Sequence, residues 1–278
     1  MAKVTPIQTN FTGGEISPRL LGRVDLTKYT ASLQTCQNFL VFPHGGVTKR
    51  SGTRFIAEVK DSSKKVRLVP FVFSTVQAYI IEFGDNYVRF YRNEGQIQNS
   101  AGTAVYEVSS PYDQNDLANL DFTQSADILY ICHPDYQTRK LSRTGHTQWS
   151  FTTLNAIDGP WGPINTTSTT FTPSATSGSL TITSSSVSGI NDGQGFLSTD
   201  VGRCIRILSN GKWGSAKIDS VTSTTQVAAT TYTDFNFGNT SASDNWRLGL
   251  WSNTTGWPRT ATFYPDRLFF ANTTKQPK

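Results

Sequence analysis

The sequence predicts a mainly β protein. Only 16% of its 278 residues are charged, whereas 22 are Gly, 17 are Phe and 10 are Tyr. Aromatic residues favour strands and Gly favours turns, so this composition favours β-structure over helix. Short apolar runs separated by Gly, Asn and Asp recur along the chain, which is typical of hairpins. The length allows one large domain or two small ones, with a sizeable core.

Residues 1–60 predict an extended docking arm that contains one short helix. Gly13-Gly14 permits backbone conformations that other residues avoid, and Pro18 biases Ser17 towards an extended conformation. We expect the short helix within 26–40, where Leu26, Tyr29, Leu33 and Phe39 form an apolar stripe. Gly45-Gly46 then indicates a turn. A segment this long and irregular is expected to dock against another surface.

Basic residues are concentrated near this arm. The first seventy residues hold eleven Lys and Arg against four Asp and Glu, and the whole chain has a net charge of +5. Such an excess is consistent with a solvated face, and equally with a contact surface for DNA or an acidic partner. The candidate contact residues are Arg19, Arg23, Lys49, Arg50 and Arg54.

Residues 61–160 predict successive strands. A β-rich run covers 66–73, and its Pro70 indicates a sheet edge or a bulge. Residues 78–83 and 87–92 are expected to form a hairpin around a three-residue loop, Gly84-Asp85-Asn86. A further strand pair is expected within 96–108.

The same region continues with a short helix or turn at 113–120. Residues 126–132 are apolar enough for a buried strand. Lys140-Leu141 and Gln148–Phe151 are expected to form a second hairpin around Thr144-Gly145.

A faint internal repeat connects three parts of the chain. In each part an aromatic residue, a short polar gap and an apolar strand follow one another, beginning at Phe71, Phe122 and Phe263. Repeated four-stranded units of this kind build β-propellers. The repeat therefore favours a partial β-propeller-like body, with its first blades in 61–160 and the start of a further blade in 258–278.

Residues 161–257 predict an inserted small β-barrel or β-sandwich module. The composition shifts to Thr and Ser after Asn165, yet Ser179–Thr183 alternates in the manner of a strand. Further strands are expected at 201–208, at 211–218 after an Asn210-Gly211 turn, at 221–229 and at 246–251.

The N-terminal motifs resemble those of one protein family in their order. Gly13, Gly14, Ile16, Ser17 and Pro18 are followed by Asn38-Phe39 and then by Gly45, Gly46, Lys49 and Arg50. This order is similar to the start of the tail nozzle proteins of short-tailed bacteriophages, also called tail tubular protein B. The resemblance continues weakly through 79–91 and 127–132, and reappears at 263–271.

The resemblance implies a structural virion protein and not an enzyme. Members of that family form a ring of six copies at the end of the tail tube, where they hold or pass the genome. The implied partners are further copies of the chain, a tail adaptor ring, tail fibres or spikes, and phage genomic DNA. The implied location is the virion tail, after assembly in the host cytoplasm.

Catalytic and metal-binding motifs were sought and none is apparent. His44, His133 and His146 lack metal-like spacing, and three separated cysteines make a poor disulfide framework. No phosphate-binding loop or nucleophile elbow is present. We therefore expect no enzyme, no cofactor and no metal. The start of the chain does not resemble a signal peptide, and no apolar run approaches membrane-spanning length.

The rival hypothesis is a carbohydrate-binding phage adhesin or tail-fibre-like module. Six Trp residues could line a sugar-binding groove, although such residues are more often core or interface anchors: Trp149, Trp161, Trp213, Trp246, Trp251 and Trp257.

The last strand carries an expectation about the extent of the chain. A lone strand at 268–271 would leave backbone groups unpaired at an exposed edge. The sequence therefore predicts that these residues are the N-terminal part of a longer protein.

Overall fold

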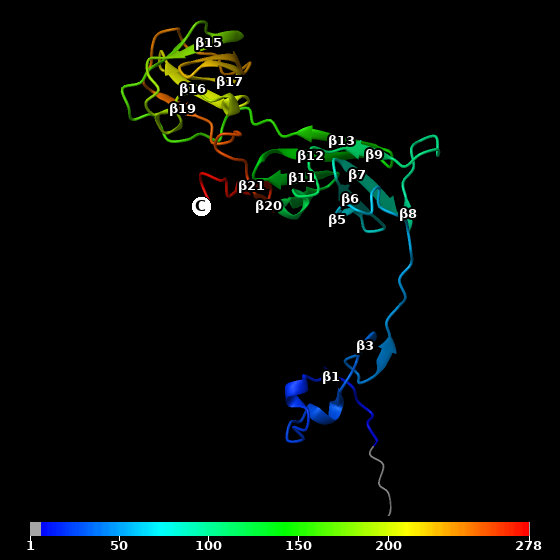
Figure 1. Cartoon of the computed structure of the whole chain (residues 1–278). Helices are drawn as coiled ribbons and strands as arrows, with labels where there is room; N and C mark the ends of the chain where they lie inside the picture. The colour runs from blue at the N-terminus through cyan, green and yellow to red at the C-terminus, as the bar shows by residue number, and fades with distance from the viewer. Residues whose placement is uncertain (1–6, 278) are drawn as a thin grey trace, which may run out of the picture. The chain divides into compact units, whose positions relative to one another are not determined.

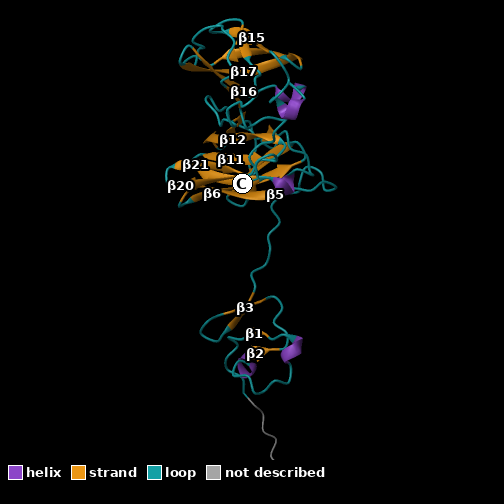
Figure 2. Cartoon of the chain, turned by 90° about the vertical axis from the view of Figure 1, so that its left-hand side faces the viewer, coloured by secondary structure: helices purple, strands orange, loops and turns teal. Residues whose placement is uncertain are grey.

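The computed structural model describes residues 7–277 and confirms the mainly β class. Strands make up 43% of the chain, no helix reaches seven residues, and one sheet curls into a half-barrel. Short helical turns are scattered among the strands in Figure 2. The chain divides into two compact units, residues 1–56 and 57–278, and each is described by itself.

The N-terminal unit consists of two small strand pairs and two 3-10 turns. Strand β1 (Gly14–Glu15) runs parallel to β2 (Ser32–Leu33), and β3 (Phe39–Val41) runs antiparallel to β4 (Val47–Lys49). The turns are η1 (Pro18–Leu20) and η2 (Tyr29–Ala31). Backbone hydrogen bonds join the segments, as between Phe11 N and Gly45 O at 2.9 Å.

The predicted helix at 26–40 is wrong. Only the single turn η2 forms there, and the chain then becomes extended in β2 and β3. The Ser32 hydroxyl donates to the Lys28 carbonyl at 2.6 Å, and Ile16 N donates to the Leu33 carbonyl at 2.9 Å. These carbonyls thus have partners outside a helix. Thr and Ser recur in this stretch, and such residues compete with helical hydrogen bonding.

The first sheet of the second unit confirms the strands predicted at 66–73, 78–83 and 87–92. Its order is β5-β6-β7-β8, and β9 also pairs with β7. The strand pair predicted within 96–108 is wrong, because β8 and β9 each pair with β7 and only a single bridge joins Gln98 to Val105. The β6–β7 loop has two residues and not the predicted three, because Gly84 pairs with Tyr87. A Cβ at Gly84 would lie 2.2 Å from the Tyr87 ring, so a larger residue at this position would clash with that ring. The strands are β5 (Arg67–Ser74), β6 (Gln77–Gly84), β7 (Tyr87–Arg92), β8 (Gly95–Gln96) and β9 (Glu107–Ser109).

The next sheet is a four-stranded meander in sequence order, preceded by the turn η3 (Leu117–Asn119). It contains the expected buried strand and second hairpin. Its strands are β10 (Asp121–Ser125), β11 (Ile128–His133), β12 (Tyr136–Gly145) and β13 (Gln148–Thr153).

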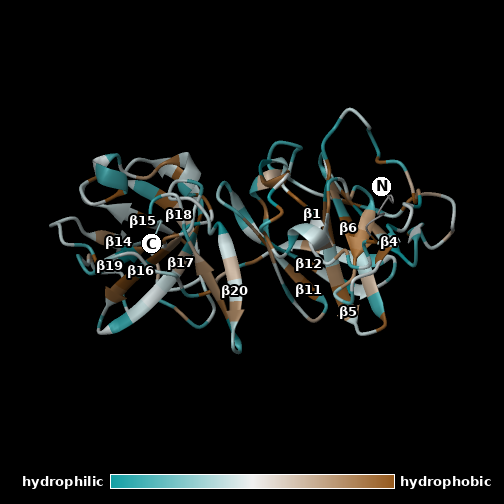
Figure 3. Ribbon diagram, turned by 90° about the horizontal axis from the view of Figure 1, so that it is seen from below, coloured by the Kyte–Doolittle hydropathy of each residue, from teal (hydrophilic) through white to brown (hydrophobic). Residues whose placement is uncertain are grey.

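These two sheets share one hydrophobic core. Phe71 is fully buried, and its ring meets that of Trp149 edge-on at 5.0 Å between centroids. Phe90 stacks on the same Trp149 at 4.3 Å. Figure 3 shows apolar residues in strands such as β11. The core comprises Val69, Phe71, Tyr79, Ile81, Phe83, Val88, Phe90, Tyr112, Leu117, Leu120, Leu129, Ile131, Leu141 and Trp149.

The edge of β5 is covered by a side chain of the second sheet. The Gln124 amide accepts from Val72 N at 3.1 Å and donates to the Val72 carbonyl at 2.7 Å. Arg67 adds a second link, because its guanidinium donates to the carbonyls of Leu117 and Leu120 at 2.8 and 2.7 Å. Side-chain hydrogen bonds therefore link β5 to β10 and to the segment that precedes β10.

The expected lone strand at 268–271 is wrong, because it has a partner. Strand β21 (Arg267–Ala271) pairs along its whole length with β20 (Thr260–Tyr264). Pro265-Asp266 supplies the turn between them. The hairpin lies against the second sheet, where Ala261 N donates to Asp121 Oδ2 at 3.2 Å and the Tyr130 and Phe263 rings meet edge-on.

The inserted region forms one six-stranded antiparallel sheet, in the order β14-β15-β18-β17-β16-β19. The predicted strand at 221–229 is wrong, since β17 ends at Ser223, which pairs with Gln226 across a turn. Polar Thr224-Thr225 makes that turn. The elements are β14 (Phe171–Pro173), β15 (Ser179–Ser184), η4 (Asn191–Gly193), η5 (Ser198–Asp200), β16 (Cys204–Ser209), β17 (Lys212–Ser223), β18 (Gln226–Thr231) and β19 (Trp246–Leu248).

This sheet has a hydrophobic core of its own, separate from that of the first two sheets. Its members are Phe171, Leu180, Ile182, Ile190, Phe196, Ile205, Ile207, Ala216, Ile218, Val227, Ala229, Phe237, Trp246 and Leu248. Figure 1 shows β15, β16, β17 and β19 gathered together, apart from strands β5 to β13.

The alternation of buried and exposed residues in β5 leads to a paired test. Phe71 is fully buried, whereas its neighbour Val72 is 59% exposed. Phe71→Ala should lower the free energy of unfolding by about 3–5 kcal/mol, because it opens a cavity in the core. Val72→Ala should change it by less than about 0.5 kcal/mol. Urea unfolding of the whole chain measures both, and equal effects would contradict the core assignment.

The separate core of the inserted sheet predicts that residues 161–257 fold alone. The fragment should show a β-type circular dichroism spectrum and a cooperative thermal transition. Within it, Ile207→Ala should cost about 2–5 kcal/mol, since Ile207 is fully buried. Ser220→Ala, at an exposed position of β17, serves as the control. A featureless, disordered spectrum of the fragment would refute independent folding.

Candidate functional site

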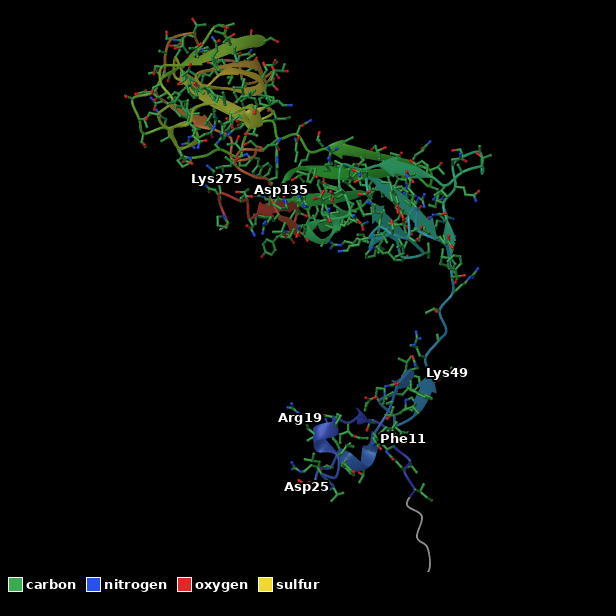
Figure 4. The ribbon with its side chains drawn as sticks, in the orientation of Figure 1. Phe11, Arg19, Asp25, Lys49, Asp135 and Lys275 are labelled. Atoms are coloured by element: carbon green, nitrogen blue, oxygen red, sulfur yellow. The ribbon has the colours of Figure 1, made fainter. Side chains whose placement is uncertain are left out.

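The five candidate basic residues lie on the surface of the N-terminal unit. Arg19 belongs to η1, Lys49 ends β4, and Arg50 and Arg54 follow β4 in extended chain. All five side chains are exposed. Figure 4 shows Arg19 and Lys49 on different segments of the unit. The fold thus does not gather all five residues at one point.

Arg23 has a carboxylate partner. Its guanidinium donates to both oxygens of Asp25, at 2.8 and 2.6 Å. This bidentate hydrogen bond raises the pKa of Arg23 and lowers the pKa of Asp25. The ion pair neutralises part of the positive charge, so Arg23 is a weaker candidate for contact with a polyanion than its sequence position suggests.

Arg50 is held in place by the residue that begins the neighbouring hairpin. Its backbone N donates to the Asn38 carbonyl at 2.8 Å, and its Nε donates to Asn38 Oδ1 at 3.3 Å. Asn38 has a φ of 60°, a conformation that Asn adopts more readily than most residues. The bonds fix Arg50 at the open end of the β3–β4 pair, next to Lys49.

The surface of this unit is also unusually apolar. Among residues 7–56 only Gly45 is buried, so the described part of the unit has no buried hydrophobic side chain. A protein surface this rich in apolar side chains commonly marks an interaction site. We call the exposed large apolar residues of the unit the apolar arm surface: Ile7, Leu20, Leu21, Val24, Phe39, Leu40, Phe42, Phe55 and Ile56.

Sequence reasoning did not identify the apolar arm surface. Leu33 and Phe39 were assigned to a helical stripe, which would have hidden them on one face. In the structure β3 is extended, and Phe39 and Leu40 remain 51% and 53% exposed. The available signal was the apolar run at 39–42 in a segment too short to bury it.

A buried carboxylate in the second unit was considered as a catalytic group. Glu82 is only 1% exposed and accepts hydrogen bonds from the hydroxyls of Tyr87, at 2.5 Å, and Tyr91. Burial and these bonds raise the pKa of Tyr91 to about 12. Both carboxylate oxygens are occupied by hydroxyl donors within one sheet. The arrangement joins β6 to β7 and gives each oxygen of the buried carboxylate a hydrogen-bond donor.

His133 is the buried imidazole of the second unit. Its side chain is 1% exposed, and its Nε2 has no hydrogen-bond partner, with Asp116 Oδ1 at 3.8 Å. Burial lowers the pKa of His133, which favours the neutral ring. Within residues 7–277, no group of three or more His, Cys, Asp or Glu side chains could hold a metal ion. The three cysteines are free thiols.

The sequence was compared with known proteins. No family profile matches it, and no curated protein matches it. Among the described helices, none is long and apolar enough to cross a membrane.

Proposed function

We propose that this chain is a structural component of a short phage tail, a nozzle protein that surrounds the path of the DNA. The observation that carries the proposal is the apolar arm surface, in a unit whose described residues bury no hydrophobic side chain. Burying apolar area is the main stabilising contribution in most protein association. An arm of this kind gains most of its stability when a partner covers it. The ordered N-terminal motifs add support.

The proposed body is a partial β-propeller. Support comes from the meander of β10 to β13 and the similar antiparallel sheet of β5 to β9, which share one core. Side-chain hydrogen bonds also link the first strands of three successive segments, since Gln124 joins β10 to β5 and Asp121 joins β10 to β20. Blades of a propeller are arranged in this manner, with their innermost strands side by side.

In the proposed assembly, six copies form a closed ring. The apolar arm surface docks on a neighbouring copy or on the tail adaptor ring. Arg19, Lys49, Arg50 and Arg54 contribute positive charge to the DNA path or to an acidic partner surface. Ring closure converts one binding surface per copy into a channel, so the mechanism is structural and non-enzymatic. Tail fibres or spikes attach to the assembled tail, which forms in the host cytoplasm.

Removal of the arm tests the assembly role. A chain that begins at residue 57 should keep the thermal transition of the β-body and should fail to join tails, because the apolar arm surface is gone. Phe39→Ser with Phe42→Ser should act in the same direction without shortening the chain. Tyr264→Ser, at a position 74% exposed in the second unit, is the matched control. Native mass spectrometry and the protein content of purified particles provide the measurements.

The arm hypothesis fails if the shortened chain enters particles in normal amounts. If the shortened chain folds and forms rings but does not join the tail, the arm docks on the adaptor ring. If the shortened chain folds but forms no rings, the arm docks on the neighbouring copy.

Neutralising the basic residues tests the contact with DNA. For double-stranded DNA, each phosphate contact adds about 0.9 to the steepness with which the logarithm of the binding constant falls as the logarithm of the salt concentration rises. Lys49→Gln, Arg50→Gln and Arg54→Gln together should therefore flatten the slope by about 2 to 3. A control triple at exposed positions of the second unit, Lys212→Gln, Arg259→Gln and Arg267→Gln, should leave it unchanged. An unchanged slope in the first triple would assign these residues to protein contacts or to solvent.

A further inference from the structure

Tryptophan and arginine side chains alternate on the outer face of the six-stranded sheet. Arg206 Cζ lies 5.6 Å from the ring centroid of Trp161 and 5.0 Å from that of Trp213. Arg247 Cζ lies 5.8 Å from the Trp213 centroid. We call the series Trp161, Arg206, Trp213 and Arg247 the Trp–Arg ladder.

The strand register explains why these side chains meet. Arg206 of β16 lies opposite Arg247 of β19, and Leu208 lies opposite Trp213 of β17. Alternate residues of a strand share a face, so these positions lie opposite the buried side chains of Ile205 and Ile207. The ladder is therefore on the face that points away from the core, and all four of its side chains are partly exposed.

Among the described residues, the nearest carboxylate to the two guanidinium groups is that of Asp158. The Asp158 carboxylate is 4.0 Å from Arg206 Nε, and its Oδ1 already accepts from Trp161 Nε1 at 3.0 Å and Ser215 Oγ at 3.3 Å. Arg247 forms no ion pair and no side-chain hydrogen bond with any residue in 7–277. The Nε atoms of Arg206 and Arg247 are buried and have no acceptor.

Stability alone does not account for this arrangement. Like charges directly opposite on neighbouring strands are destabilising, and Arg206 and Arg247 are such a pair. The contacts with the Trp rings offset this repulsion by about 0.5–1 kcal/mol for each arginine. Exposed Lys217 lies on the same face, two residues from Ser215, and adds another positive charge. The face is thus a preorganised cationic surface whose charge is not satisfied within the described chain.

The stacking also indicates which kind of anion fits. Arg206 and Arg247 both lie over the Trp213 ring, so they compete with any base that would stack there, as single-stranded nucleic acid requires. A stacked guanidinium still presents its N–H edge, whose fork geometry matches a carboxylate. We infer that the Trp–Arg ladder binds an acidic polysaccharide, with its carboxylates on Arg206 and Arg247 and its sugar rings beside the Trp rings. This activity goes beyond the proposed role in the tail ring.

Direct binding tests the inference on the full chain. The probe is polygalacturonate, a polymer of uronic acid, with dextran as the neutral polysaccharide and a single-stranded DNA oligonucleotide as the other polyanion. Calorimetry and the fluorescence of the ladder Trp residues report binding. Arg247→Gln should weaken polygalacturonate binding by about tenfold or more, as expected for a lost charge-assisted hydrogen bond. Arg206→Gln should do the same.

Two further variants separate specific recognition from net charge and from folding. Arg247→Lys keeps the positive charge but removes the planar guanidinium with its paired N–H donors, so it should also weaken binding. Arg267→Gln makes the same charge change at an exposed position of β21 and should alter affinity by no more than about twofold. Within residues 7–277 the Arg247 side chain forms no ion pair or hydrogen bond and lies over the Trp213 ring, so its variants should keep the wild-type melting temperature.

Three results would overturn the inference. The wild-type chain fails to bind polygalacturonate, or binds dextran equally well. The ladder variants bind as tightly as the Arg267→Gln control. Single-stranded DNA binds more tightly than polygalacturonate through the same arginines. None of these results depends on ring formation, which native mass spectrometry measures separately, so this inference and the proposed tail function can fail independently.

Discussion

The second unit depends on one constraint: antiparallel strands must bury one face and can expose the other. In β5 the fully buried Phe71 is followed by Val72, which is 59% exposed. The same alternation directs Ile205 and Ile207 inward and leaves Arg206 outside. Two separate cores result, one shared by the first two sheets and one within the inserted sheet. The outer faces are then free to carry charges that a core would not tolerate.

The sequence predicts the elements whose partners are close along the chain. The β6–β7 and β12–β13 hairpins follow from local apolar runs and short polar turns. The helix at 26–40 failed because hydrogen bonds to distant backbone groups, such as that from Ile16 to Leu33, extend the chain there. The lone last strand failed because its partner, 260–264, has weak apolar character. Periodicity within one segment contains no information about such pairings.

The same distinction between local sequence and distant contacts applies to the candidate sites. The exposure of Arg19, Lys49 and Arg50 can be predicted from their charge alone. The ion pair of Arg23 with Asp25 depends on the folded backbone, which places the two side chains within hydrogen-bonding distance. The Trp–Arg ladder joins residues 161, 206, 213 and 247, and only the strand register of the folded sheet makes them neighbours. The two surfaces also differ in kind. The apolar arm surface suits permanent burial by a protein, while the ladder suits a solvated anionic polymer.

The hydrogen bond between Ala261 and Asp121 has a consequence for synthesis on the ribosome. It joins residues 140 positions apart, with the whole inserted sheet made in between. At about 5–20 residues per second, the ribosome needs roughly 5–20 s to make that insertion. During this interval β10 has not yet been joined by its later neighbour β20. A self-contained inserted core helps the later docking, since it lets the intervening chain become compact before the hairpin emerges.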